Sequence, residues 1–278
     1  MTLIRIACSP DSDDAFMFHA LAHGEIDTEG LSFTVEQHDT DTLNALASED
    51  RIDVVAVSAA RYATIADRYL LLPHGASVGR GFGPVVVAKT GCDTGELAGK
   101  RIAVPGLQTT AYVVLRILLD RFEPVVVPIA PHDAVWRSLR SREVDAALVI
   151  HEGRLTYERE GFALVCDVGE AWSRVYGLPL PLGVNVIRRA LGRDDIARVS
   201  RVCRRSILWA SAHRDALLRA LAGKSPLDAA GLDRYLAMYA NADTEAMAAD
   251  VLEGLSKLFS EALSRGLIDR APPIDLAP

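Results

Sequence analysis

The sequence predicts an α/β protein with two similar lobes, and three observations support this prediction. Short β-rich runs alternate with helical patterns over the first two thirds of the chain. Two pairs of segments within that part repeat one another in the same order. The last third changes character and is helical, with Gly or Pro only between its helices. Alternating strands and helices form βαβ units around a largely parallel sheet that helices cover on both faces.

The first lobe is expected to begin with a buried strand at 3–8, followed by strands at 31–37 and 52–57. Helices are expected at 13–23 and 40–48, where apolar residues recur at helical spacing. Asp13 and Asp14 stand where N-caps or first-turn acids occur.

An internal repeat relates the middle of the chain to its beginning. Residues 5–7 and 101–103 both read RIA, and in each case seven residues separate this motif from an alanine followed by an aromatic residue. The apolar run at 52–58 is likewise echoed at 144–151. Each match alone is weak, but two matches in one order at nearly the same offset predict two similar α/β lobes.

The second lobe and the helical third complete the expected architecture. The elements expected in the second lobe are strands at 101–104, 124–129 and 144–150 and helices at 109–122 and 132–141. The helices expected after it lie at 194–221, 227–240 and 244–265. Strands near 84–89 and 183–188 would cross between the lobes. We therefore expect one lobe from residues 1–88 with 187–278, and a second from 89–186.

The composition excludes several classes of protein. The chain has 278 residues, 50% of them hydrophobic and 24% charged, which is typical of a globular protein and not of a disordered or fibrous one. The net charge is −7 and the 30 basic residues are dispersed, so we expect no nucleic-acid or membrane partner. The apolar runs are shorter than the about 20 residues that span a bilayer. The N-terminus does not resemble a signal peptide, which predicts a cytoplasmic protein.

Candidate site residues follow the predicted strands, because ligands of α/β sheets bind beyond the carboxyl ends of strands. This rule selects residues 9–14, Ser58, residues 106–110 and His151. Thr109 and Thr110 open a helix, whose free amides favour an anion such as a carboxylate, although one threonine could serve only as a cap. His151 ends a buried strand, where a histidine is commonly structural but could also act as a general base.

Metal and nucleotide sites have weaker support. Cys8, Cys92, Cys166 and Cys203 are far apart in sequence, with no zinc-ligand spacing, and are expected to be reduced thiols. His19 and His23 lie one helical turn apart, but no third ligand accompanies them, so a solvated helix face is expected. The glycine-rich stretch 75–84 matches neither a dinucleotide-binding motif nor a P-loop, and a cleft-rim or hinge loop fits it better.

Several motifs together resemble the 1,4-dihydroxy-6-naphthoate synthase family of the futalosine route to menaquinone. They are 14–21 (DAFMFHAL), 79–84 (GRGFGP), 104–112 (VPGLQTTAY), 150–157 (IHEGRLTY), 177–183 (GLPLPLG) and 239–241 (YAN). The resemblance implies a two-lobed fold like that of the type II periplasmic binding proteins, with a central ligand cleft and no metal or organic cofactor. It also implies cleavage of cyclic dehypoxanthinyl futalosine, a small-molecule carboxylate, to 1,4-dihydroxy-6-naphthoate by a carbon–carbon lyase.

The resemblance also assigns site residues. The proton-accepting histidine of the family falls on His151, and its substrate-binding serine falls on Ser58. Its paired threonines fall on Thr109 and Thr110. The other substrate-binding residues expected are Asp14, Ala56 and Val57.

Two departures from the family pattern leave the exact substrate open. A stretch like Cys-Pro-Asn-Asp-Thr is usual after the first strand, whereas residues 11–15 read DSDDA and keep only Asp14. The position two residues before the binding serine often carries lysine, and here it is Ala56. Losing a cation and gaining acids should weaken anion binding. A cytoplasmic small-anion solute-binding protein and the related chorismate dehydratase are therefore alternative functions.

Overall fold

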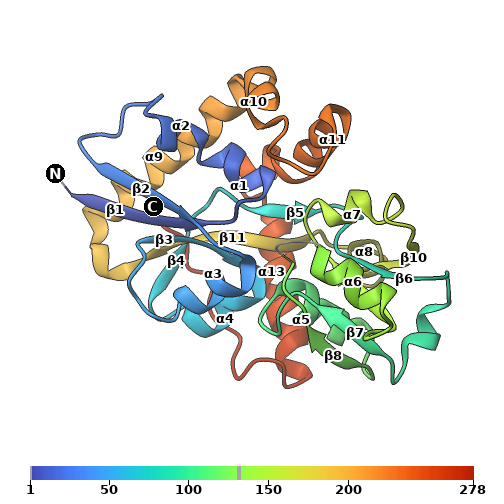
Figure 1. The fold of residues 1–278 in the computed structure, drawn as a ribbon. Coiled ribbons are helices and arrows are strands. Elements are labelled where there is room, and N and C mark those ends of the chain that lie inside the picture. The colour runs from blue at the N-terminus through green and yellow to red at the C-terminus, as the bar shows by residue number, and fades with distance from the viewer. Residues whose placement is uncertain (1, 130–132) are drawn as a thin grey trace.

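A computed structural model describes residues 2–129 and 133–278, and two β-sheets lie side by side in it (Figure 1). The first sheet has six strands in the order β2-β1-β3-β11-β4, with β5 also paired to β11. Its strands are β1 (Leu3–Cys8), β2 (Ser32–Gln37), β3 (Val54–Ser58), β4 (Tyr69–Leu71), β5 (Ser77–Gly79) and β11 (Leu180–Arg188). The second sheet has five strands in the order β10-β6-β9-β7-β8. They are β6 (Val85–Ala88), β7 (Arg101–Val104), β8 (Glu123–Val126), β9 (Ala146–Val149) and β10 (Ala163–Asp167).

The two sheets share one pairing pattern, which explains the repeat in the sequence. In the first sheet β1 pairs in parallel with β2 and β3, and in the second β7 pairs in parallel with β8 and β9. The strands β1 and β7 carry the two RIA motifs, and β3 and β9 carry the second repeated run. The predicted two-lobed α/β fold is confirmed.

The prediction of largely parallel sheets is wrong, because both sheets are mixed. β11 runs antiparallel to β3, and β6 runs antiparallel to β9. The pairing of each of these strands begins at the last residue of its neighbour, as Gly183 pairs with Ser58 and Val85 with Val149. A strand that enters a sheet at the edge where the parallel strands end has to run in the opposite direction. β6 and β11 each arrive from the other lobe, and each runs antiparallel to its neighbour.

Helices cover the sheets, and two of the predicted helices are interrupted where no residue pattern indicates a break. The region 13–23 forms two helices that meet at Phe18, and 194–221 is interrupted at His213. The longer helices are α3 (Thr40–Leu46), α5 (Thr110–Leu118), α6 (Asp133–Arg140), α8 (Val168–Tyr176), α9 (Arg193–Ala212), α10 (Arg214–Leu221), α11 (Ala229–Tyr239) and α13 (Ala249–Ser264). The shorter ones are α1 (Ser12–Met17), α2 (His19–His23), α4 (Tyr62–Ile65), α7 (Gly153–Thr156) and α12 (Ala242–Glu245), with 3-10 turns at η1 (Ala59–Arg61), η2 (Thr94–Leu97) and η3 (Arg189–Leu191). His132, expected to begin a helix, lies outside the described residues.

The core of the first lobe has a layer on each face of its sheet. On one face Ile4 and Ile6 of β1 pack with Val199 and Val202 of α9, which crosses the sheet in Figure 1. On the other face β3 belongs to a cluster that includes residues of α5 and of α13, and α13 lies between the two sheets in Figure 1. Alternate strand residues point to opposite faces. This alternation lets one strand contribute to both layers.

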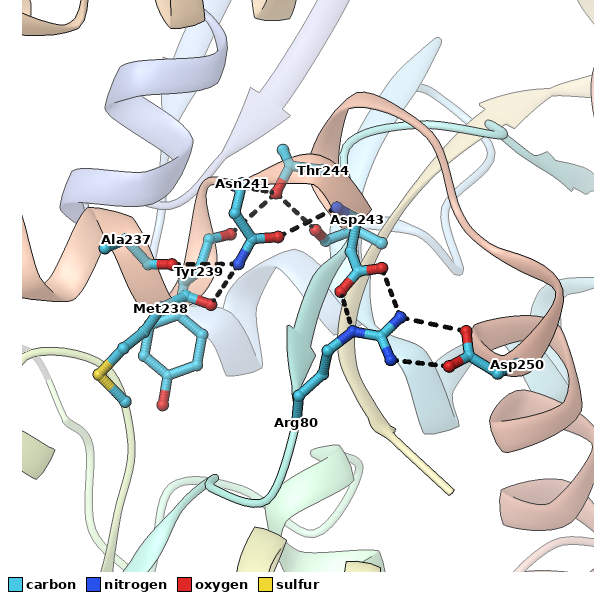
Figure 2. A network of polar contacts seen from close by, with 9 residues as sticks. Arg80, Ala237, Met238, Tyr239, Asn241, Asp243, Thr244 and Asp250 are labelled. Atoms are coloured by element: carbon cyan, nitrogen blue, oxygen red, sulfur yellow. Dashed lines mark hydrogen bonds and ion pairs between the residues drawn. The ribbon is translucent and has the colours of Figure 1, made fainter. Parts of the chain in front are cut away.

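An ion-pair network fixes the segment where the chain crosses between the sheets. Residues 80–84 connect β5 of the first sheet to β6 of the second. Arg80 in this segment donates from Nε and Nη2 to the Asp243 carboxylate, at 2.7 and 2.8 Å, and from Nη1 to Asp250 at 2.7 Å (Figure 2). Asn241 and Thr244 form a capping box around Asp243. The predicted lobe boundaries, near residues 88 and 186, stay a prediction.

The four cysteines form no disulfide bond. Cys8, Cys92, Cys166 and Cys203 are all free thiols, and Cys8 and Cys203 are buried. Within the described part of the chain, every helix is too short or too polar to cross a membrane.

Candidate active site

A cleft lies where the parallel strands of the sheets end, and it is lined by every residue assigned a catalytic or substrate-binding role, whereas residues 10–12 and 106–108 of the wider candidate set do not line it. It holds about 780 Å³ of empty space, part of it open to solvent. The predicted residues that line it are Asp14, Ala56, Val57, Ser58, Thr109, Thr110 and His151. Ser58 ends β3 and His151 follows β9, so equivalent strands of the two repeats deliver these two side chains.

His151 is held at both ring nitrogens. Its Nδ1 lies 2.9 Å from Oδ2 of Asp11, and its Nε2 lies 3.0 Å from Oγ1 of Thr40. The backbone of His151 has a φ of 52°, in the left-handed region that few residues other than glycine adopt. Burial opposes the charged form of the ring, but the Asp11 carboxylate, together with Asp13 and Glu152, outweighs burial and raises the pKa of His151 to about 10. The imidazole of the ligand-free protein is therefore protonated at neutral pH.

Three further carboxyl groups beside His151 are buried and hydrogen-bonded. Asp14 accepts from the Ser9 amide at 2.6 Å. Asp13 accepts from Tyr235 Oη at 3.0 Å and from Ser77 Oγ at 2.7 Å, and Glu152 accepts from Ser12 Oγ at 2.7 Å.

Burial disfavours the ionised form of these three carboxyl groups. It raises the pKa of Asp13 and Asp14 and raises the pKa of Glu152 to about 7. The site is therefore less negative than its number of acids suggests.

Ser58 is fixed by an asparagine that the sequence did not single out. Asn44 on α3 accepts from the Ser58 amide at 3.0 Å and donates from Nδ2 to Ser58 Oγ at 3.1 Å. Asn44 uses Ser58 Oγ as an acceptor, so the hydroxyl proton of Ser58 is not spent on this contact. No pattern around Asn44 marked it, because it lies in the middle of a short helix.

The hydroxyl groups of both predicted threonines already donate to carbonyl groups of the chain. Thr109 Oγ1 donates to Gly106 O at 2.8 Å and accepts from the Tyr112 amide at 3.2 Å, which makes it the N-cap of α5. Thr110 Oγ1 donates to Leu182 O at 2.7 Å and accepts from the Ala60 amide at 3.1 Å. Each hydroxyl has a single proton to donate, so an anion at this helix would meet backbone amides.

Asn185 and Arg154 also line the cleft and were not predicted from the sequence. Asn185 pairs with Ala56 across β11 and β3, and its Oδ1 is buried without a hydrogen-bond partner among the described residues. Arg154 contacts Asp167 and Gly83 O at 2.6 Å each. The IHEGR motif could have pointed to Arg154, but a strand asparagine such as Asn185 carries no signal in a single sequence.

The histidines of α2 stack on each other. The rings of His19 and His23 have centroids 4.0 Å apart, and His19 also stacks on Trp209 at 5.9 Å. Across residues 2–129 and 133–278, no group of three or more His, Cys, Asp or Glu side chains could hold a metal ion.

Comparison with known proteins decides the family. The sequence profile of the menaquinone biosynthesis family matches residues 4–263. The chain belongs to the menaquinone biosynthesis family. A 1,4-dihydroxy-6-naphthoate synthase of Thermus thermophilus is 37% identical over 273 residues, which cover 98% of each chain. A synthase of the same name from Streptomyces coelicolor is 33% identical over 281 residues, covering 99% of this chain and 98% of the relative.

Solved structures show how far the fold of this family member is shared. A crystal structure of a protein from Archaeoglobus fulgidus superposes with a TM-score of 0.90 at 42% identity, covering 96% of this chain and 98% of the other. The alkanesulfonate-binding protein SsuA from Xanthomonas axonopodis, bound to MOPS, superposes with a TM-score of 0.72 at 17% identity, covering 100% of this chain and 96% of the other. This confirms the expected periplasmic-binding-protein-like fold.

Proposed function

We propose that this chain is a 1,4-dihydroxy-6-naphthoate synthase that cleaves cyclic dehypoxanthinyl futalosine, with His151 as the proton-accepting base. The observation that carries the proposal is the meeting of His151, Ser58 and the start of α5 in one cleft. Full-length relatives named for this activity support the assignment of the substrate. No step of the proposed reaction calls on a cofactor.

The substrate carboxylate would bind at the start of α5. The amides of Thr110 and Ala111 precede the first hydrogen bond within the helix, which Val113 donates to Thr109 O. Amides at a helix N-terminus point at an anion and carry partial positive charge. Ser58, whose hydroxyl proton is not spent on Asn44, would donate a further hydrogen bond. Backbone dipoles would thus take the place of the lysine that is absent at Ala56.

The acids of the site are compatible with an anionic substrate. Burial, helped by the neighbouring Asp13, raises the pKa of Asp14 well above its ordinary value and so favours its neutral form. A neutral carboxyl group does not repel a carboxylate and donates a hydrogen bond instead. Burial also raises the pKa of Asp13, one of the acids gained after the first strand, while the other, Asp11, pairs with His151. These acids therefore oppose anion binding less than their formal charge implies.

His151 would take the proton as its deprotonated form. Imidazole is the commonest general base, and removal of such a base typically costs about 10²–10⁴-fold in rate. Because the pKa of His151 is raised to about 10, the basic form is a minority at neutral pH. We therefore expect kcat/KM to rise with pH from neutrality toward an alkaline plateau.

Product formation tests this proposal directly. The purified protein is incubated with cyclic dehypoxanthinyl futalosine, and 1,4-dihydroxy-6-naphthoate is measured by absorbance and mass spectrometry. We expect catalytic turnover of the substrate. Thermal stabilisation by the substrate without product would refute the proposal and favour a solute-binding protein. Turnover of chorismate instead would favour the dehydratase.

A further inference from the structure

We propose that Asp11 is a positioning residue that fixes the proton of His151 on Nδ1 and leaves Nε2 to receive the proton of the substrate. The inference deepens the proposed function and rests on His151 being the base. Asp11 stands in the stretch where the chain departs from the usual family pattern. Because Asp11 contacts His151, this departure from the family pattern acts directly on the proposed base.

The Asp11 carboxylate is itself held in place. Asp11 lies between the end of β1 and the start of α1, and its side chain is 14% exposed. Ser9 Oγ donates to Oδ2, the oxygen that faces His151, and the Asp11 amide donates to Ser9 Oγ at 3.1 Å. Side-chain and backbone hydrogen bonds together limit the rotation of this carboxylate. A fixed carboxylate can in turn fix an imidazole.

The contact with Asp11 determines the tautomer of His151. An ionised carboxylate only accepts hydrogen bonds, so Nδ1 of a ring 2.9 Å away has to carry a hydrogen. The neutral ring then has its lone pair on Nε2, where Thr40 Oγ1 lies 3.0 Å away and can donate to it. When Nε2 takes a proton from the substrate, the resulting imidazolium faces the Asp11 carboxylate. One contact thus orients the base and stabilises its product.

Other charged groups near His151 act differently. Asp13 and Asp14 on α1 and Glu152 beside the ring each accept hydrogen bonds from other residues. Tyr235 on α11 is bonded to Asp13, and Arg154 on α7 is paired with Asp167. These groups change the charge around the ring. Asp11 touches the ring, and its loss should have effects that the loss of a more distant charge does not.

The test compares Asp11→Asn with the wild-type enzyme and with Asp13→Asn as a matched control. The pKa and tautomer of His151 are measured by ¹⁵N NMR of histidine-labelled protein, and pH profiles of kcat and KM are recorded in parallel. We expect Asp11→Asn to lower the pKa of His151 by about 1–3 units and to move the rising limb of the profile equally. At the alkaline plateau, kcat should fall about 100-fold or more with KM changed less than about threefold. Asp13→Asn should give a smaller shift of the pKa.

The outcomes separate this inference from the proposed function. If wild-type protein forms no naphthoate, the proposed function fails and the role of Asp11 fails with it. If wild-type protein turns over and Asp11→Asn leaves the tautomer, the pH profile and kcat unchanged, only the inference on Asp11 is overturned. Asp11→Glu covers the case in which the amide variant does not fold. This variant keeps the carboxylate, so His151 should retain the Nδ1–H tautomer. Loss of that tautomer in Asp11→Glu would also overturn the inference.

Discussion

Replacement of Thr110 by valine should destabilise the protein strongly although the two side chains have nearly the same shape. Thr110 is 2% exposed and connects three elements through one hydroxyl group. The hydroxyl accepts from the Ala60 amide of η1 at 3.1 Å and donates from α5 to Leu182 O of β11 at 2.7 Å. Valine leaves both backbone groups without this partner, the Ala60 amide in a buried contact and Leu182 O in a partly buried one.

The size of the effect follows from these two groups. Each buried backbone group left without a hydrogen bond costs about 1–3 kcal/mol. The valine side chain has no hydroxyl group to remove from water on folding, which offsets a part of that cost. We therefore expect a loss of about 2–4 kcal/mol in the free energy of unfolding, a large part of the about 5–15 kcal/mol of a typical protein.

The assay is urea unfolding followed by far-UV circular dichroism, with Thr110→Ser as the matched control. Serine keeps the hydroxyl and loses only a methyl group, which should cost about 1 kcal/mol. The unfolding midpoint should fall clearly more for valine than for serine, with an unchanged m-value. Equal losses for the two variants, or a loss below about 1 kcal/mol for valine, would refute the reasoning.

Three further predictions concern the segment that crosses between the sheets, the buried histidine and the cleft. Arg80→Ala should reduce the free energy of unfolding by about 1–2 kcal/mol in thermal unfolding, because the 9% exposed Asp243 side chain loses its cation while the pair is still partly open to solvent; an unchanged Tm would contradict this. Burial lowers the pKa of His74 to about 4 from 6.5, so the unfolded state binds a proton in this window and stability falls as the pH drops from 6.5 toward 4. His74→Gln should remove up to about 1.4 kcal/mol per pH unit of that dependence, and parallel pH curves for both proteins would contradict it. Asn185→Leu should raise the stability of the ligand-free protein by about 1 kcal/mol and raise KM, since it removes a buried acceptor that has no hydrogen-bond partner among the described residues and lines the cleft; a lowered stability with unchanged KM would contradict this.

Buried strands and the residues that follow them were predictable from the sequence. The strands at 3–8 and 101–104 were predicted with the bounds they have, because short apolar runs between turn residues leave few alternatives. Ser58 and His151 were found by one rule, that ligands bind beyond strand ends, and both line the cleft.

Features set by tertiary contacts were not predictable. An apolar run carries no sign of its direction, so the antiparallel course of β6 and β11 stayed hidden. The break at His213 has no glycine or proline beside it, and packing of α10 against α11 decides it instead. Asn44 supports Ser58 from another element, and only the fold brings the two together. The pairing of Asp11 with His151 likewise joins residues 140 positions apart.

The most direct test of the proposed mechanism is turnover by His151→Ala with its ligand binding measured on the same preparation. Calorimetry gives the affinity for cyclic dehypoxanthinyl futalosine, and absorbance gives the rate of naphthoate formation. If His151 is the base, kcat should fall at least about 100-fold, while the amides of α5 and Ser58 keep the affinity within about tenfold. Full turnover by His151→Ala would contradict the mechanism.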